Sequence, residues 1–556
     1  VMQLSHTKVL TQTPRTEMSN WDSSVLSNSS LYFTGQSDKI TALHGEFVLH
    51  EHDLASTGKL ISEISGNFGL VFQSESRTIA VSDPCNSHPI LIGYDQDEDY
   101  YVISASGSNL ARILSLESKD TSPAAALSIA LSGYTIGEDT LYPDVRFLPP
   151  GTLVVLEIGE LPKYIQHHRF QPWQPGSGNR EALKSDLMDA TRALFERLIS
   201  SLDGRPVVIP LSGGLDSRLM AAGLKEFGYR DVRCFAYGRS GNHEAKASRE
   251  ISERLGYPWQ FVPYTIKRQK SVYNTEYHKE FVNYSDHLSG VHFEQEFLAL
   301  RDLKDSGWLP EASVVVNGQS GDFISGNHIP TQLIDHQVLE RDARIRQIAD
   351  LLLAKHFKLW RSAVTDKTAD IIRKQLAQQL LQNDAISDNS ENDFGVYEWS
   401  EFLNRQCKYV VQNVRVYEFF GYDWRMPLWD REYMDFWADV PVSEKHGQNL
   451  YREVLHQLNW GNVWREIPVN AKTIQPAWLR PIRYGLKVLH APLGRERWHR
   501  FEERYLVYWM DNLCSNALLP YRVSASDFRG HIGAMSWWTK AYLERKGISL
   551  EAAADL

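Results

Sequence analysis

The chain has 556 residues, several times the usual length of a domain, so two or more domains are expected. Apolar residues make up 42% of the chain and charged residues 23%, which excludes a disordered or collagen-like protein. The formal net charge of −10 gives the whole molecule no attraction to nucleic acid or to an anionic membrane, although a local basic surface stays open.

The four cysteines are scattered and never occur as C-x-x-C. This spacing indicates neither a disulfide framework nor a cysteine-rich zinc site, and it favours a reducing cytoplasm. The longest apolar runs have the length of strands rather than the roughly 20 residues that span a bilayer. The sequence therefore predicts a soluble, cytoplasmic protein without a transmembrane segment.

The first part of the chain has the pattern of an antiparallel β domain. Short apolar alternations follow one another, with turn-rich residues between them. The predicted strands are Gly69 to Gln73, Thr78 to Ser82, Ile90 to Tyr94, Tyr101 to Ser104 and Thr152 to Glu157. The cluster QPWQPGSGNR at 171–180 then marks a boundary, so we expect one domain over residues 1–172 and a second over residues 183–556.

After this boundary, strand-like runs alternate with helical runs, which predicts a parallel sheet with crossover helices. Val207 to Leu211 and Val232 to Tyr237 each precede a helix, and Val314 to Val316 is a further strand. Helical periodicity dominates the rest of the chain. The predicted fold class is therefore α/β and α+β, with a helical C-terminal portion.

The strand from Val207 leads directly into the loop Ser212-Gly213-Gly214-Leu215-Asp216-Ser217, and a helical run follows. Two glycines would let the backbone turn sharply and bring N–H groups to phosphate oxygens, while the helix N-terminus adds its positive dipole. Asp216 would carry magnesium, because a carboxylate aimed at a polyphosphate needs a cation between them. The plain alternative is a turn followed by an exposed acid.

The string LSGGLDS resembles the signature of PP-loop ATP-pyrophosphatases, in the form found in the synthetase domain of asparagine synthetases and their relatives. Three further segments are similar to this asparagine synthetase-like family, in the same order along the chain: Phe235 to Gly238, Val314 to Asp322 and Arg425 to Asp430. The resemblance implies that ATP and Mg²⁺ are bound. It implies Asp216 and Asp322 as the two magnesium ligands.

The resemblance also implies which residues act. The nucleotide-binding residues would be Leu211, Ser212, Gly213, Gly214, Leu215, Asp216, Ser217, Tyr237, Asn317 and Gly318. The catalytic residues would be Lys472, Gln319 and Asp322, with Lys472 stabilising the charge that develops on the leaving pyrophosphate.

Gln319 stands where ammonia-using relatives have a glutamate, and its amide cannot accept a proton at neutral pH. Gln319 would then orient the substrate or the nucleophile, or a base would come from elsewhere. The open alternatives for that base are His328, Glu294, Glu296 and the stretch Tyr417 to Tyr422.

The first domain resembles the family's other half, a class II glutamine amidotransferase domain with an Ntn-hydrolase-like fold, at Gly66 to Val71 and Leu148 to Gly151. Such a glutaminase uses an N-terminal cysteine, whereas this chain begins Val1-Met2 and its first cysteine is Cys85. His44-Gly45-Glu46-Phe47 has histidine where the glutamine-binding turn has asparagine. The resemblance therefore implies a degenerate domain, with ammonia from solution or a separate glutaminase, or another amine in its place.

Two other patterns could indicate a binding site: histidines that could bind a metal, and a basic stretch that could bind an anion. His167-His168 and the lone His292 have no third ligand at the spacing of a metal site, so they favour no metal cluster. From Arg480 to Arg504, basic residues alternate with aromatic ones. This stretch could hold a nucleotide-sugar pyrophosphate, a lipid-linked saccharide at a membrane surface or RNA, and the plain alternative is a solvated helix face.

The implied function is an ATP-dependent carbon–nitrogen ligase that adenylates a small-molecule carboxylate and transfers the acyl group to ammonia or an amine. The loop Gly318 to Pro330 resembles that of asparagine synthetase-type proteins of surface-polysaccharide gene clusters, which suggests amidation of a uronic acid in lipopolysaccharide biosynthesis. Three rivals stay open: an intramolecular cyclase of the β-lactam or lasso-peptide type, a PP-loop RNA-modifying enzyme and a non-catalytic scaffold. We expect no nucleic-acid partner, because the charge of −10 counts against one, and a homodimer stays open.

Overall fold

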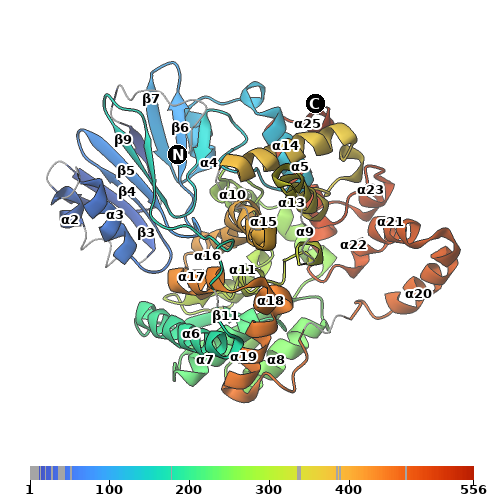
Figure 1. Ribbon diagram of the computed structural model, residues 1–556. Coiled ribbons are helices and arrows are strands. Elements are labelled where there is room, and N and C mark those ends of the chain that lie inside the picture. Colours follow the sequence, from blue (N-terminus) through green and yellow to red (C-terminus); the bar gives the residue numbers. More distant parts are fainter. Residues whose placement is uncertain are drawn as a thin grey trace.

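The computed structural model describes residues 12, 14–18, 21–26, 29–35, 44–49, 53–176, 178–334, 340–382, 386, 390–469 and 473–555. Within this part of the chain, three sheets are surrounded by helices (Figure 1).

Two sheets lie in the N-terminal part. Their strands are β1 (Arg15–Glu17), β2 (Asp22–Leu26), β3 (Ser29–Gly35), β4 (Phe68–Gln73), β5 (Arg77–Ser82), β6 (Leu91–Asp95), β7 (Tyr100–Ser104), β8 (Val145–Phe147), β9 (Thr152–Glu157) and β10 (Lys163–Gln166). One sheet is antiparallel, in the order β10-β9-β5-β4-β3-β2, and the other has the order β1-β7-β6-β8, with β1 parallel to β7. The five strands predicted in this part are confirmed, each to within one residue at either end.

The alternation of side chains along the strands determines how these sheets are covered. The helices of this part are α2 (His44–Leu49), α3 (Leu54–Glu63), α4 (Gly107–Ile113) and α5 (Pro123–Ser132). Successive residues of a strand point to opposite faces, so on β4 Leu70 and Phe72 pack under α2 and α3, whereas Val71 faces the four-stranded sheet. Leu91 and Val102 of that sheet pack on their other face with residues of α4 and α5. The N-terminal part is therefore a four-layer arrangement of helices, sheet, sheet and helices.

The third sheet is parallel. Its strands are β11 (Val207–Pro210), β12 (Val232–Gly238), β13 (Trp259–Pro263), β14 (Val314–Val316) and β15 (Asp423–Arg425), in the order β13-β12-β11-β14-β15. The chain winds outward from β11 to β12 and β13 and then returns to the other side of β11 as β14. The winding therefore reverses between β11 and β14, and such a switch point leaves a ligand crevice at the carboxyl ends of the strands.

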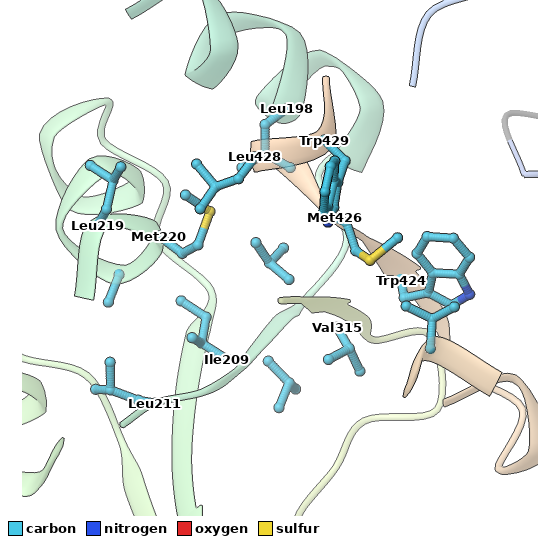
Figure 2. Close-up of a cluster of buried hydrophobic side chains, with 14 of the residues drawn as sticks. Leu198, Ile209, Leu211, Leu219, Met220, Val315, Trp424, Met426, Leu428 and Trp429 are labelled. Atoms are coloured by element: carbon cyan, nitrogen blue, oxygen red, sulfur yellow. The ribbon is translucent and has the colours of Figure 1, made fainter. Parts of the chain in front are cut away.

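A continuous apolar core fixes the two strands at the switch point. Helix α6 (Arg180–Leu202) precedes β11, helices α7 (Asp216–Glu226) and α8 (His243–Leu255) follow β11 and β12, and all three pack on the sheet. Ile209 of β11 and Val315 of β14 lie in this core beside Leu219 and Met220 of α7 (Figure 2). Trp424 of β15 extends the same core toward the far edge of the sheet (Figure 2).

The C-terminal part is helical, as the sequence predicts. The helices that pack on α5 in one shared core are α13 (Arg341–His356), α14 (Asp366–Gln382), α15 (Asp393–Glu401), α24 (Ala534–Arg545) and α25 (Leu550–Ala554). The remaining helices are α9 (Ile266–Tyr273), α10 (Glu276–Tyr284), α11 (Phe297–Asp305), α12 (Gly321–Ile324), α16 (Arg415–Phe419), α17 (Arg431–Asp439), α18 (Val442–Lys445), α19 (Asn449–Leu458), α20 (Leu479–His490), α21 (Arg495–Tyr505), α22 (Val507–Met510) and α23 (Tyr521–Ser526), with a π-helix at Phe402–Val410.

The mixed α/β fold class is thus confirmed: N-terminal antiparallel strands, a parallel sheet and a helical C-terminal portion. Within the described residues, no helix combines the length and the apolar character needed to cross a membrane. All four cysteines are buried and free.

Candidate functional site

A cavity of about 760 Å³ opens at the switch point of the parallel sheet. The loop that follows β11 lines it through Ser212, Gly214 and Ser217, and the loop that follows β14 lines it through Asn317 to Ser320. The crevice expected from the topology is therefore present at the carboxyl ends of β11 and β14.

Hydrogen bonds between its own residues shape the loop after β11. The Ser212 and Ser217 hydroxyls lie 3.0 Å apart, and the Gly214 N–H donates to the Ser212 hydroxyl over 3.2 Å. Neither Gly213 nor Gly214 has a positive φ, so the loop requires glycine for the missing side chain rather than for a left-handed turn. The N-terminus of α7, which begins at Asp216, follows directly and adds unpaired N–H groups.

The loop after β14 touches the first loop because it carries two glycines. A Cβ on Gly318 would lie 2.6 Å from the Ser217 nitrogen, and a Cβ on Gly321 would lie 2.5 Å from Oδ1 of Asp216. The Asp322 N–H donates to Oδ2 of Asp216 over 3.0 Å. The two acids singled out by the sequence therefore meet, although 106 positions separate them.

The meeting of these two acids is electrostatically unfavourable. Enclosure by the protein, followed by the charge of Asp322, raises the pKa of Asp216. The Tyr451 hydroxyl donates to Oδ1 of Asp216 over 3.2 Å, which relieves only part of the repulsion. Two carboxylates in this position fit a divalent cation, since oxygen ligands and negative charge are what Mg²⁺ prefers.

A cationic wall faces the acids. Nε2 of His328 lies 3.4 Å from Oδ2 of Asp322, and its Nδ1 hydrogen-bonds Glu401. Glu401 also accepts from Lys355 over 3.0 Å and lies 3.2 Å from His356. Although burial opposes it, the charge of Glu401 and hydrogen bonds to Asp322 and Glu401 raise the pKa of His328 to about 9. His328 is therefore protonated at neutral pH and cannot serve as the general base that the sequence left open.

Glu296, another acid named from the sequence, lies deep in the cavity. It accepts from the Tyr417 hydroxyl over 2.5 Å and from the Tyr237 hydroxyl over 3.3 Å. Burial raises the pKa of Glu296 to about 7, so this carboxyl can exchange a proton near neutrality. Tyr237 stacks on Tyr264 with ring centroids 5.3 Å apart, which gives this end of the cavity a flat aromatic wall.

The other residues predicted at the site divide into three groups. Gln319 and Asn317 line the cavity: the Gln319 N–H donates to Oδ1 of Asn317 over 2.9 Å, while the Gln319 side-chain oxygen is buried without a hydrogen-bond partner. Leu211 packs in the core of the sheet (Figure 2), and neither it nor Gly213 is among the described lining residues. Lys472 lies outside the residues that the structure describes.

Several lining residues carry charge and have no local sequence signal. They come from three places far apart in the chain, the end of α13, the π-helix and α19, and only the fold brings them together: Lys355, His356, Lys358, Arg405 and Arg452. This excess of cations suits a polyphosphate and a second anionic group.

Arg218 fixes the first loop from behind. Its side chain is fully buried, and its guanidinium donates to the carbonyls of Gly213, Val463 and Ile467 over 2.9–3.0 Å. Ile467 precedes Lys472 by five positions in the sequence. Arg218 therefore ties the phosphate loop to the segment that leads to the predicted lysine.

The N-terminal residues named from the sequence have ordinary partners. His44 is buried and lies 3.2 Å from the Ser29 hydroxyl and 3.0 Å from that of Ser24. His167 contacts the Ser82 carbonyl over 2.8 Å, and His168 pairs with a carboxylate elsewhere on the chain, so these neighbours point to different groups.

His292 is not isolated, contrary to the expectation from the sequence. His278, His292 and Glu294 bring one ligand atom each to within 4.8 Å of one another. The fold supplies two partners that spacing did not reveal, and Glu294 belongs to this cluster rather than to the large cavity.

Comparison with known proteins bears on the parallel-sheet part. Residues 191–459 match the asparagine synthase family model. A search of curated protein sequences found no match.

Two solved structures are similar to parts of the chain. An allosteric regulatory enzyme of purine biosynthesis is 12% identical over 59% of this chain and 59% of that one, with a TM-score of 0.17. A glutamine phosphoribosylpyrophosphate amidotransferase from B. subtilis is 10% identical over 55% of this chain and 64% of that one, also with a TM-score of 0.17. The chain thus spans less than two thirds of either protein, and at these TM-scores neither likeness carries an argument.

The family match covers β11, β14, both acids of the cavity and the cationic wall. This family is one of ATP-dependent amide-forming ligases. Residues 191–459 of the chain are therefore assigned to an asparagine synthase domain.

Proposed function

We propose that this protein activates a carboxylate with ATP and joins it to ammonia or an amine. The observation that carries the proposal is the contact between Asp216 and Asp322 at the switch point, beside a glycine-rich loop and a helix N-terminus. A carboxylate and ATP would give an acyl-adenylate and pyrophosphate. Ammonia would then displace AMP, with loss of one proton, to give the amide.

The nucleotide would lie between the two loops. Backbone N–H groups of Ser212 to Ser217 and the start of α7 would bind phosphate oxygens. Tyr237 would contact the base end, because it stacks on Tyr264 in the aromatic wall of the cavity. Asp216 and Asp322 would hold Mg²⁺, which supplies charge neutralisation for the phosphates.

Cationic side chains would stabilise the leaving pyrophosphate. His328, protonated at neutral pH, lies beside Asp322, and Lys355 and Arg405 line the same wall. Lys472 is proposed for the same role on the resemblance alone. Fixed positive charge at the place where negative charge develops is the most effective form of such stabilisation.

The amine step would use Gln319. Its side-chain oxygen is buried without a partner, so an N–H of the incoming nucleophile would satisfy it. Glu296, with a pKa of about 7, is the described carboxyl in the cavity best suited to take the released proton. Cys85 is buried, and burial raises the pKa of its thiol well above the ordinary value, so this thiol is not proposed as a nucleophile.

The acid substrate would be anionic beyond its reacting carboxylate. Lys358 and Arg452 line the cavity in addition to the cations at the phosphates. A sugar uronic acid, free or carried on a phosphate, fits this charge, and we propose this substrate class for a cytoplasmic step of surface-polysaccharide synthesis. An intramolecular cyclase is the second candidate, because the cavity volume of about 760 Å³ also admits a substrate that carries both groups.

The test is carboxylate-dependent exchange of labelled pyrophosphate into ATP, with Mg²⁺, across uronic acids, nucleotide-sugar uronates, aspartate and small peptides. Exchange with one acid class would support adenylation and name the substrate. Asp322→Asn is the matched inactive control. Absence of exchange with every acid, together with absence of ATP binding by calorimetry, would overturn the proposal in favour of a scaffold.

A further inference from the structure

Helices α20 and α21 form an arm, residues 478–505, that projects from the molecule (Figure 1). Leu479 and Leu486 of α20 pack with Trp498 and Leu506 in an apolar cluster separate from the main cores. This cluster explains how the arm folds, but it covers only one face of α20.

Another face of α20 is apolar and exposed. Trp478, Ile482 and Leu489 follow at spacings of four and seven residues, which places them on one side of a helix. Leu489 is 72% exposed and Trp478 57% exposed, and Val488 beside them is also exposed. Single exposed apolar residues are ordinary, whereas a contiguous stripe of them marks an interaction surface.

The arm is positively charged on a negatively charged molecule. Seven arginines and lysines stand against three glutamates between Arg480 and Arg504, while the whole chain has a net charge of −10. Arg480 and Lys487 on α20 and Arg497 on α21 are exposed. On α20 the spacing places Arg480 and Lys487 on the side opposite the apolar stripe, so the helix has an exposed apolar side and an exposed basic side.

We propose that the arm docks the protein on an anionic lipid surface, with α20 in the plane of the interface and its apolar stripe among the lipids. An apolar stripe on one side of a helix with arginine and lysine on its polar side is the pattern of helices that lie on membranes, and each cation near an anionic surface adds about 1 kcal/mol. A second copy is the less fitting occupant, because a symmetric contact between two arms would bring like charges together. The inference does not depend on the proposed reaction.

The test is co-sedimentation of the full chain with vesicles of phosphatidylcholine alone and of phosphatidylcholine with phosphatidylglycerol. Binding is expected only to the anionic vesicles and should weaken at high salt. The double variant Ile482→Ser, Leu489→Ser should lose roughly tenfold or more in affinity, because two large apolar side chains leave the interface. The matched control Ile158→Ser, Leu161→Ser removes two exposed apolar residues elsewhere and should bind normally.

Equal vesicle binding by the wild type and the arm variant would overturn the proposal. So would absence of binding to anionic vesicles. A dimer in light scattering that the arm variant loses, with no vesicle binding, would assign the stripe to a second copy instead.

A separate observation concerns the cluster of His278, His292 and Glu294. All three residues are buried, and Nε2 of His278 lies 2.9 Å from Oε2 of Glu294, with Nε2 of His292 3.8 Å from the same oxygen. His292 is 95% buried, yet neither ring nitrogen has a hydrogen-bond partner. Leaving a buried polar group unpaired costs about 1–3 kcal/mol, so the cluster lacks a component.

The geometry points to a Zn²⁺ site formed by these three residues. Two imidazoles and one carboxylate are a common zinc ligand set. His292 and Glu294 also line a second cavity of about 360 Å³, which gives a path for the ion and room for a fourth ligand. Tyr409 and Met535 line both this cavity and the large one, so an ion here would stiffen the wall between them.

Metal content of the purified chain, measured by mass spectrometry after zinc loading and removal of excess, tests the site. About one zinc per chain is expected, with the cobalt-substituted protein showing the visible absorption of low coordination number. His292→Gln and Glu294→Gln should lose the ion, whereas His287→Gln, at another buried histidine, should keep it. Absence of zinc in the wild type, or full retention in both site variants, would overturn the assignment.

Discussion

Asp83 and Asp216 are both enclosed aspartates at the end of a strand, and their surroundings differ in kind. Asp83, which follows β5, accepts from the backbone N–H groups of Phe68, Cys85 and Ser87 over 2.9–3.1 Å, and from the Ser87 hydroxyl. Asp216 has one hydroxyl and one N–H, and that N–H belongs to a second acid.

The difference separates a structural carboxylate from the one proposed to hold a cation. Four donors stabilise the charge of Asp83 without any ligand, so this residue holds the N-terminal sheets and the loop after β5 together. Asp216 is opposed by the charge of Asp322, so its environment is complete only with a cation. Asp83 is thus satisfied as it stands, whereas Asp216 keeps unfavourable charge beside it where a cation would bind.

The largest effect is expected at the opposed pair. Asp322→Asn should lower pyrophosphate exchange roughly 1000-fold, because the magnesium ligand is lost and with it several kcal/mol of charge stabilisation. The melting temperature without Mg²⁺ should stay level or rise, since the variant removes repulsion. A lower melting temperature would instead show that Asp322, like Asp83, stabilises the fold.

Asp83→Asn should show the opposite pattern. The free energy of unfolding should fall by about 3 kcal/mol, because charge-assisted hydrogen bonds from backbone N–H groups are weakened or broken. Exchange activity per folded molecule should persist, since Asp83 does not line the large cavity. Urea unfolding and exchange on the same preparation measure both quantities; lost activity with unchanged stability would refute the distinction.

His287 is a buried titratable residue that packs against the N-terminal part. Its buried ring packs at the edge of Phe147, near Asp286, Lys408 and Arg415, and neither nitrogen has a hydrogen-bond partner. Burial lowers the pKa of His287 from 6.5 to about 4, so the unfolded chain binds more protons between these values.

Stability should therefore fall as the pH drops from 6.5 toward 4. Across that window the unfolding free energy of His287→Phe should fall by about 2 kcal/mol less than that of the wild type, because the variant has no histidine at this position that binds a proton on unfolding. Urea midpoints at several pH values measure the slope. Parallel slopes for the two proteins would exclude His287 as a cause.

The smallest effect is expected at Arg218. Arg218→Lys keeps the charge but loses the fork that reaches the carbonyls of Gly213, Val463 and Ile467, so the unfolding free energy should fall by about 1–2 kcal/mol. Affinity for ATP should weaken more than this stability loss suggests, because the phosphate loop is no longer fixed from behind. Unchanged ATP affinity, measured by calorimetry, would limit Arg218 to a packing role.

The sequence determined the elements that depend on local patterns. Alternating apolar residues gave the strands β4 to β7 and β9 to within one residue, because side-chain period and strand length are local properties. The string from Ser212 to Ser217 predicted a phosphate loop for the same reason, since its strand, glycines, acid and helix are contiguous, and this loop lines the cavity. Gln319 was likewise placed at the cavity from its motif.

Only the tertiary structure decided which distant groups face one another. No local pattern marks Glu401, Lys355 or Arg405. In the fold, Glu401 pairs with both His328 and Lys355, and Lys355 and Arg405 line the same cavity as His328. The same holds for the partners of His292, which lie on α10 and in the following loop. The raised pKa of His328 removes one of the general bases that the sequence left open. A pKa depends on burial and neighbouring charge, and these are properties of the folded chain rather than of residue order.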